Sequence, residues 1–303
     1  MNERRALGFG LSAVLLWSTV ATAFKLTLAE FTPIQMLCIA SMVSAIALTI
    51  VCGVQGKLNQ LSATFLSNPW YYLLLGLINP LAYYLILFKA YDLLPASQAQ
   101  AINYSWAITL TLMAAVFLGQ KIRGKDWIAC GFSYLGVIVI ATQGNVLGMQ
   151  FESPLGVGLA LLSTLLWAGY WILNTKNKAD PVIGVLLGFL VAIPFTIALS
   201  WYEGASWHSI SSIKGWAAVT YVGLFEMGVT FVLWLSALKL TQNTARISNL
   251  IFASPFISLM LLATIIGEKI HPSTLIGLVL IISGLVIQQV TWGKKAKAAN
   301  ASQ

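Results

Sequence analysis

Residues 221–238 read YVGLFEMGVTFVLWLSAL, and every residue of this stretch except Glu226 suits the interior of a lipid bilayer. A helix needs roughly 20 mostly apolar residues to cross the hydrocarbon, so the stretch predicts a membrane-spanning helix. A carboxylate near the middle of such a helix is costly when it faces lipid. We therefore expect Glu226 to face the interior of a helix bundle, where protein groups or water can offset that cost.

The rest of the chain has the same composition. Hydrophobic residues make up 58% of the 303 residues and charged residues only 9%, whereas soluble proteins contain about 25% charged residues. So few charges cannot cover a water-exposed surface, and the chain is predicted to be an integral membrane protein without a separate soluble domain. Its three cysteines lie in apolar runs and match neither a disulfide framework nor a zinc motif.

Hydropathy and proline positions together predict ten membrane-spanning helices. Proline is tolerated in the first turn of a helix, where the backbone N–H has no intrahelical partner, and most of the prolines fall at or just before a predicted start. The predicted helices cover residues 6–29, 34–54, 69–91, 96–118, 126–143, 155–174, 181–201, 215–238, 244–266 and 273–292.

Basic residues predict the orientation in the membrane. With the N-terminus inside, all but four of the 17 Lys and Arg residues fall on the cytoplasmic side, and the positive-inside rule then places both termini in the cytoplasm. The net charge of +8 is accounted for by this bias and by anionic lipid, so no nucleic-acid partner is expected. The expected location is a bacterial inner membrane.

The chain also repeats itself. Five helices precede the second copy, and an odd number of helices inverts it relative to the first, as in many transporters whose site lies near the midplane. The predicted organisation is a first repeat over 1–143, a periplasmic connecting loop over 144–154, a second repeat over 155–292 and a basic cytoplasmic tail over 293–303. The matched segments are GFGLSAVLLWS (8–18) with GLALLSTLLWA (158–168), LGLINPLAYYL (75–85) with VGLFEMGVTFV (222–232), and LGQKI (118–122) with IGEKI (266–270).

Two five-helix halves, each with a Leu-Leu-Trp first helix and a Gly-Glu/Gln-Lys-Ile element after the fourth helix, resemble the drug/metabolite transporter superfamily. Within it the sequence looks most like the bacterial aromatic amino acid exporters, although Gln120 departs from the more usual Glu. The resemblance implies an all-α integral membrane fold of ten helices around a central cavity. The first, third, fourth, sixth, eighth and ninth helices would line the cavity, and the fifth and tenth would pack at the periphery.

Glu226 and Asn79 align in the two repeats, which favours the midplane for both. Glu226 could bind a substrate ammonium group, or it could be a protonated acid bonded to a backbone carbonyl or to Asn79. Asn79 precedes Pro80, so its amide could contact substrate or satisfy backbone groups that the proline disturbs. Pro80 and Pro255 are predicted helix breaks or hinges, and Asn249, which lies near Pro255 in the ninth helix, is a candidate substrate-binding residue.

Two further sets of residues are substrate-binding candidates. Gln100, Asn103 and Tyr104 fall on nearly one face of the fourth helix, and lipid is the wrong solvent for such a stripe, so it faces a cavity or forms interhelical hydrogen bonds. Deep aromatic rings could stack on an aromatic side chain or attract an ammonium group, with ordinary packing as the alternative for each. These rings are Trp17, Tyr83, Trp106, Trp167 and Tyr170.

These patterns predict an exporter of amino acids, aromatic ones above all, that works by facilitated alternating access. Export of another small metabolite or drug, with proton coupling through Glu226, is the alternative, and a non-transport membrane protein is the rival from a different class. The sequence holds no metal-spaced cluster, nucleotide motif or catalytic constellation. We therefore expect no enzyme activity, no cofactor or metal, and no obligate protein partner; the expected partners are the small-molecule substrate and the lipid bilayer.

Overall fold

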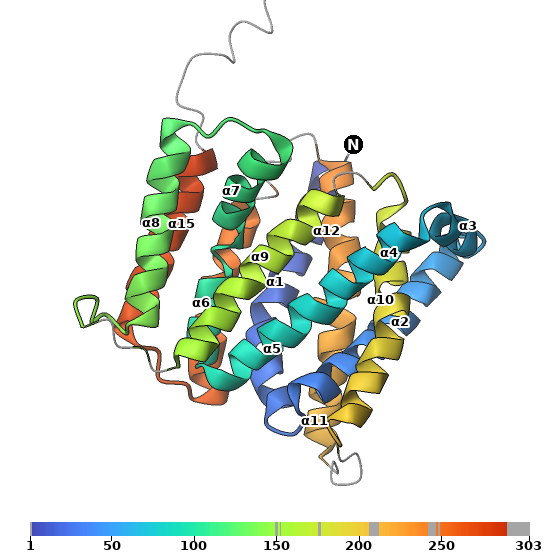
Figure 1. Cartoon of the computed structure of the whole chain (residues 1–303), viewed down its shortest axis with the longest axis horizontal. Helices are drawn as coiled ribbons and strands as arrows, with labels where there is room; N and C mark the ends of the chain where they lie inside the picture. Colours follow the sequence, from blue (N-terminus) through green and yellow to red (C-terminus); the bar gives the residue numbers. More distant parts are fainter. Residues whose placement is uncertain are drawn as a thin grey trace, which may run out of the picture.

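The computed structural model describes residues 2–148, 151, 153–174, 177–205, 212–241, 247 and 249–289, and every regular element in these ranges is a helix (Figure 1). Nine of the described segments are long and apolar enough to cross a bilayer. They are α1 (Glu3–Leu28), α2 (Pro33–Val54), α4–η1–α5 (Pro69–Gly76, Leu77–Ala82, Tyr83–Leu93), α6–α7 (Ala96–Asn103, Trp106–Leu118), α8 (Gly124–Ala141), α9 (Pro154–Asn174), α10 (Pro181–Tyr202), α11–η2–α12 (Ile213–Tyr221, Val222–Glu226, Val229–Leu240) and α15 (Pro272–Gln289).

A tenth apolar stretch, Leu250–Ile266, is shorter than the others. It consists of η3 (Leu250–Ala253), α14 (Ser254–Leu261) and η4 (Leu262–Ile266). The predicted ninth helix begins at 244, and most of residues 244–248 lie outside the described residues. Residues 290–292 of the predicted tenth helix and the predicted tail over 293–303 also lie outside the described residues. The other predicted helices correspond to observed ones, and the structure adds a short helix that was not predicted, α3 (Gln60–Ser67).

Helix starts follow from capping side chains and first-turn prolines. Thr32 and Gln35 form a capping box at the start of α2, with Pro33 in the first turn. Asn68 caps α4, and Asp180 caps α10, each directly before a proline. Each cap oxygen accepts a hydrogen bond from a first-turn N–H that has no helical partner, namely that of Gln35, Tyr71 or Val182. The proline before it has no N–H that needs a partner, so each pair fixes a boundary.

Four of the ten segments are interrupted, and they are the third, fourth, eighth and ninth. The third breaks at Asn79, which has an extended backbone (φ −141°, ψ 118°) inside η1. The eighth breaks after Glu226, where Gly228 leaves helical geometry (φ −123°, ψ −94°). Interrupted helices are tolerated at membrane depth only where protein or water satisfies the freed backbone groups. The interruptions therefore indicate where a polar site can lie.

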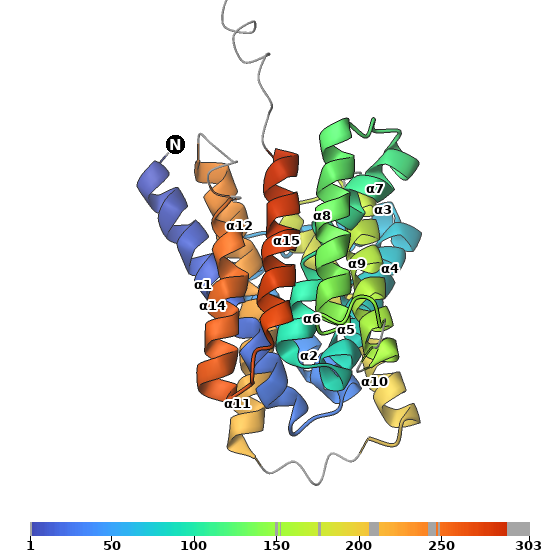
Figure 2. The same ribbon diagram turned by 90° about the vertical axis from the view of Figure 1, so that its left-hand side faces the viewer.

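Helices α8 and α15 pack side by side at one edge of the bundle (Figures 1 and 2). A Cβ atom on Gly136 would lie 2.5 Å from the carbonyl oxygen of Gly277, and one on Gly284 would lie 2.6 Å from that of Ala129. Small residues let membrane helices approach closely. This peripheral pair agrees with what the family resemblance implies for the fifth and tenth helices.

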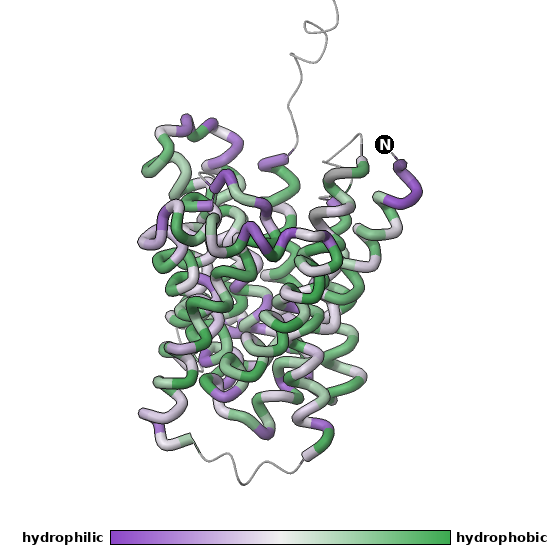
Figure 3. Tube along the Cα trace, turned by 90° about the vertical axis from the view of Figure 1, so that its right-hand side faces the viewer, coloured by the Kyte–Doolittle hydropathy of each residue, from purple (hydrophilic) through white to green (hydrophobic). Residues whose placement is uncertain are grey.

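The hydropathy of the chain divides along the bundle. In Figure 3 the hydrophobic residues run through the middle of the helices, and hydrophilic residues gather at the ends, with a minority inside the bundle. Many large apolar side chains are exposed along the outside, including Leu15, Val116 and Trp201. Such a surface suits lipid, not water, which accords with the composition. The inverted relation of the two halves stays a prediction.

Candidate functional site

Glu226 lies at the break of the eighth segment and points towards the third. The Tyr84 hydroxyl, on α5, donates a hydrogen bond to Glu226 Oε1 at 3.2 Å. Tyr84 is almost fully buried, whereas Glu226 is only half-buried. The carboxylate therefore faces the interior of the bundle, as the sequence predicts. Its hydrogen-bond partner is Tyr84, which the sequence did not single out.

The break beside Glu226 leaves carbonyl oxygens that other side chains satisfy. Ser44 of α2 donates to the Gly223 carbonyl oxygen at 2.6 Å, and Thr230 donates to that of Phe225. Because hydroxyl groups already donate to these carbonyl oxygens, a protonated Glu226 is not needed as their hydrogen-bond donor.

Asn79 lies at the corresponding break of the third segment, followed by the buried Pro80. Its Oδ1 atom is buried without a hydrogen-bond partner among the described residues, and the Tyr170 hydroxyl of α9 lies beside its side chain. An unpaired buried carbonyl is costly. Asn79 thus retains an unused acceptor in the interior, where a substrate donor or a water molecule could bond it.

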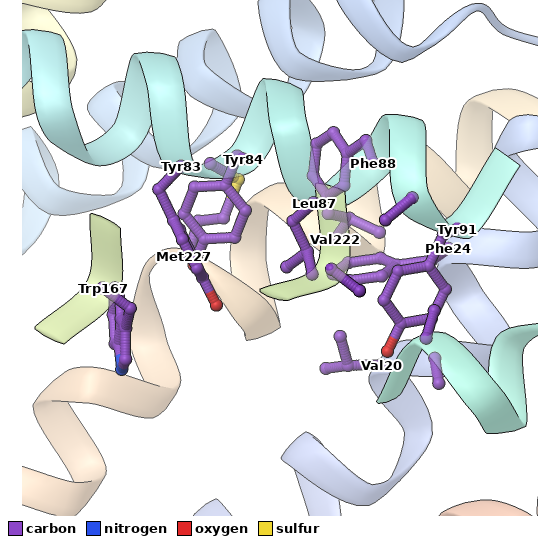
Figure 4. Packing of buried hydrophobic residues seen from close by; sticks show 14 of the residues in the cluster. Val20, Phe24, Tyr83, Tyr84, Leu87, Phe88, Tyr91, Trp167, Val222 and Met227 are labelled. Atoms are coloured by element: carbon purple, nitrogen blue, oxygen red, sulfur yellow. The ribbon is translucent and has the colours of Figure 1, made fainter. Parts of the chain in front are cut away.

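Trp167 is the centre of the aromatic residues. It is 9% exposed and stacks on Tyr83 (ring centroids 4.6 Å apart, 27° between planes) and on Tyr170 (5.7 Å, 22°). Trp106 meets it edge-on at 6.3 Å. Figure 4 shows Tyr83, Tyr84, Trp167 and Met227 grouped together at one end of the view. Three helices, α5, α7 and α9, therefore contribute rings to one cluster.

Trp17 joins this cluster through Phe231 of α12. The Phe231 ring lies 5.7 Å from that of Trp17 and 6.3 Å from that of Trp167, and Trp17 also contacts Trp234 at 5.4 Å. We call the six residues the aromatic cluster: Trp17, Tyr83, Trp106, Trp167, Tyr170 and Phe231. Phe231 was not predicted, although it aligns with Tyr84 five residues after the matched pair Asn79 and Glu226. That shared offset is the sequence signal that could have revealed both.

The polar residues of the fourth segment lie against neighbouring helices. Asn103 Nδ2 donates to Ser163 Oγ of α9 at 2.9 Å, and the Tyr83 hydroxyl lies beside Asn103. The Tyr104 hydroxyl lies beside Ser254. The stripe is therefore interior and its Asn103 forms an interhelical hydrogen bond.

Gln100 is buried, and its Oε1 atom has no partner among the described residues. Pro255 lies in the first turn of α14, where a 3₁₀ turn gives way to an α-helix. Asn249 departs from the prediction. It is exposed directly before η3, and its neighbour Leu250 packs against Gly10, about two helical turns along α1 from Trp17. The structure does not bring Asn249 to the aromatic cluster.

Within the described ranges no group of three or more His, Cys, Asp or Glu side chains could hold a metal ion. A family model described as the EamA-like transporter family matches residues 4–142 and 154–288. The chain belongs to this family. The resemblance to the drug/metabolite transporter superfamily is thereby confirmed, and the protein is a multi-pass membrane protein of a transporter family.

Among curated relatives, this EamA-like chain is 25% identical over 265 residues to the aromatic amino acid exporter YddG of Ancylobacter novellus, covering 86% of this chain and 89% of the exporter. It is also 25% identical over 238 residues to a probable amino-acid metabolite efflux pump of Escherichia coli, covering 74% and 79% of the two chains. A crystal structure of another protein superposes on this chain with a TM-score of 0.65 at 22% sequence identity, covering 95% of this chain and 97% of the other. This last likeness shows the fold alone.

Proposed function

We propose that this EamA-like protein exports amino acids, aromatic ones in particular, across a bacterial inner membrane by alternating access and down the substrate gradient. Two relatives with names that specify amino-acid export or efflux support the substrate class. The interior residues support it independently, because they offer a partner for each part of an aromatic amino acid.

The observation that carries the proposal is the connection between a carboxylate and a stack of rings. Tyr84 bonds Glu226, and its chain neighbour Tyr83 stacks on Trp167. An α-amino acid carries an ammonium group, which Glu226 can bind as a charge-assisted pair. An aromatic side chain can then lie against the aromatic cluster, where offset stacking and edge contacts stabilise it.

The substrate carboxylate needs hydrogen-bond donors. The amide nitrogens of Asn79 and Gln100 and the hydroxyl of Tyr104 are donors on the third and fourth segments. The substrate would thus bridge the two halves, with its ammonium group on the eighth segment and its carboxylate on the third and fourth. Binding at the interface of two inverted halves permits release to either side as one half rocks against the other.

The second candidate is proton-coupled export of another small metabolite or drug. It is favoured by the position of Glu226, which lies halfway along the Ile213–Leu238 segment and is half-buried. Intramembrane carboxylates in such positions serve as proton relays in many transporters.

Efflux from proteoliposomes distinguishes the two candidates. Vesicles are loaded with phenylalanine, tryptophan, leucine or alanine, and release is followed with and without an imposed pH gradient. The first candidate predicts faster release of the aromatic pair and no response to the gradient. If all four amino acids leave at the rate measured with loaded, protein-free vesicles, amino-acid export is excluded. A rate that follows the pH gradient would favour coupling.

The proposed orientation can be checked in cells. With both termini cytoplasmic, a single cysteine introduced into the 144–154 connection should react with a membrane-impermeant maleimide in intact cells. One placed after residue 293 should react only after lysis. A C-terminus that is labelled in intact cells would contradict the proposed topology.

A further inference from the structure

A polar cavity lies at the end of the bundle that the positive-inside rule assigns to the cytoplasm. Its volume is about 260 Å³, and it opens between the α7–α8 connection and the last turn of α15. The side chains that matter for its chemistry are Thr111, Lys121, Arg123, Lys125, Asp126 and Gln288. It is separate from the Glu226 site, and amino-acid export gives it no role.

The lining of this cavity carries a surplus of positive charge. Three cations, Lys121, Arg123 and Lys125, line it with one carboxylate, Asp126. The Asp126 carboxylate is buried and accepts a hydrogen bond from the backbone N–H of Arg123 at 2.8 Å. Lys125 Nζ donates to the Gln288 carbonyl oxygen at 2.5 Å near the end of α15. Lys121 and Arg123, by contrast, are exposed at the cavity mouth.

The floor of the cavity is fixed by contacts between helices. The Gln288 side chain donates a hydrogen bond to the Thr111 hydroxyl of α7, and the bond from Lys125 joins α8 to the same residue of α15. The cavity thus lies where the peripheral pair α8 and α15 meets the rest of the bundle. A ligand bound there would contact both parts.

Large apolar side chains are exposed directly beside the cations. Trp127 and Ile128 of α8 are 61% and 53% exposed, and Phe117 of α7 is 66% exposed. Exposed apolar side chains next to a tryptophan and basic residues are typical of the boundary between hydrocarbon and headgroups. A molecule with an anionic head and apolar tails matches both surfaces at once.

We propose that this cavity binds the phosphate of an acidic phospholipid headgroup, with the acyl chains along the exposed apolar surface of α7 and α8. The Arg123 guanidinium can bind phosphate in a bidentate manner, and Lys121 adds a second charge. The N-terminus of α8 adds N–H groups and a favourable dipole. Basic pockets between membrane helices bind anionic headgroups by these interactions.

The test measures lipid binding by the purified full-length protein in detergent, by native mass spectrometry and by the shift of the thermal unfolding midpoint. The probes are dioleoyl phosphatidylglycerol, dioleoyl phosphatidylcholine and inorganic phosphate. Wild-type protein should bind phosphatidylglycerol more tightly than phosphatidylcholine. Each cation near the surface contributes about fivefold, so Lys121→Gln with Arg123→Gln should weaken phosphatidylglycerol binding roughly 25-fold and leave phosphatidylcholine binding unchanged.

The chain supplies a matched control at the opposite end of the bundle. Lys269 occupies in IGEKI the position of Lys121 in LGQKI, and Lys214 and Lys269 are both exposed. Lys214→Gln with Lys269→Gln also removes two positive charges, but at other positions, and should leave phosphatidylglycerol binding within about twofold of wild type. If the first double variant is not monodisperse on gel filtration, Lys121→Gln is compared with Lys269→Gln, and the expected loss is about fivefold.

Three results would overturn the proposal. Equal affinity for the two lipids would show that the cavity does not recognise the negative charge of the headgroup. An equal loss in the Lys214 and Lys269 control would mean that net charge, not this cavity, attracts the lipid. Displacement of phosphatidylglycerol by millimolar inorganic phosphate would identify a site for free phosphate. None of these readouts depends on transport, so they are separate from the tests of export.

Discussion

The third and eighth membrane segments break at aligned residues, Asn79 and Glu226, but the two breaks differ in chemistry. The third combines an amide with Pro80, and the Asn79 carbonyl oxygen lies close to Gly188 of α10. The eighth combines a carboxylate with Gly228, and its freed carbonyls are bonded by hydroxyls. Both breaks thus expose polar groups inside the bundle, but only the second has a side chain that can carry a negative charge. In the proposed function, this difference places the substrate ammonium group on the second half.

The two breaks are supported alike by glycines three residues earlier, at Gly76 and Gly223. A Cβ atom on Gly76 would lie 2.9 Å from the Gly188 carbonyl oxygen of α10, and one on Gly223 would lie 2.8 Å from the Ala40 carbonyl oxygen of α2. Each interrupted segment therefore packs closely against the second helix of the other half. This parallel supports the proposed inverted repeat.

The largest expected effect is on folding. Gly76→Leu and Gly223→Leu each force a side chain into a backbone, so each should destabilise the protein by about 3 kcal/mol or more. Thermal unfolding in detergent measures this loss. Gly158→Leu is the control, because nothing lies within 4 Å of its Cβ position. If only one of the two breaks is sensitive, the breaks are not built alike and the parallel is lost.

The next effect concerns selectivity and compares Trp167 with its aligned partner Trp17. Trp167 stacks on two rings, whereas the rings of Trp17 meet their neighbours edge-on or tilted. Stacked pairs contribute about 0.5–1.5 kcal/mol beyond burial, so Trp167→Leu should lower the phenylalanine-to-leucine transport ratio about tenfold. Trp17→Leu should lower it less. Equal loss of both substrates in both variants would make these rings packing elements.

A smaller effect is expected for the hydroxyl that bonds Glu226. Tyr84→Phe removes one hydrogen bond to the Glu226 carboxylate and keeps the ring, so the apparent affinity for phenylalanine should fall about fivefold. Competition for binding by unlabelled phenylalanine measures it. The matched variant Tyr83→Phe removes a hydroxyl beside Asn103, and we expect it to leave the dependence on the substrate ammonium group intact. A Tyr84 variant identical to wild type would show that this hydroxyl does not position the carboxylate.

The smallest expected effect concerns Asp180, whose carboxylate already forms an ion pair within the protein. Asp180 pairs with Lys57 at 2.7 Å at the bundle end. Burial raises the pKa of Asp180, but hydrogen bonds from Lys57 and the Val182 N–H outweigh it, so the pKa lies below its ordinary value. The stabilisation is therefore complete above the unfolded-state pKa of about 4 and is lost as pH falls through the lower folded-state pKa.

Asp180→Asn keeps a capping side chain and loses only the ion pair, which contributes about 0.5 kcal/mol. The free energy of unfolding is measured at pH 7 and pH 3, and the advantage of wild type over the variant should be smaller at pH 3. An advantage that persists unchanged at pH 3 would show that the carboxylate charge is not its source.

Much of the fold could be predicted because prolines, caps and hydropathy act locally. Pro33, Pro69, Pro154, Pro181 and Pro272 all begin observed helices. The interior position of Glu226 was predicted from the cost of its charge. Tyr84 was missed because Tyr83 and Tyr84 are adjacent tyrosines, and only the rotation of α5 decides which one meets the carboxylate.

Interactions between distant residues could not be predicted. Glu268 of the IGEKI element accepts hydrogen bonds from the backbone N–H groups of Ala96 and Ser97, both at 3.0 Å. It thereby caps α6, which lies some 170 residues earlier in the chain. The motif alone does not reveal this partner. Asn249 was grouped with the site because it lies near Pro255 in sequence, but it is exposed directly before η3.

The central claim is that Glu226 binds the substrate ammonium group. It is tested most directly by exchange in proteoliposomes of phenylalanine and of 3-phenylpropionate, which lacks the amine, with wild type and Glu226→Gln. If the carboxylate holds the ammonium group, Glu226→Gln should reduce phenylalanine exchange at least tenfold and leave 3-phenylpropionate exchange unchanged, since removing either partner removes the same interaction. Phenylalanine exchange at the wild-type rate in Glu226→Gln would contradict the claim.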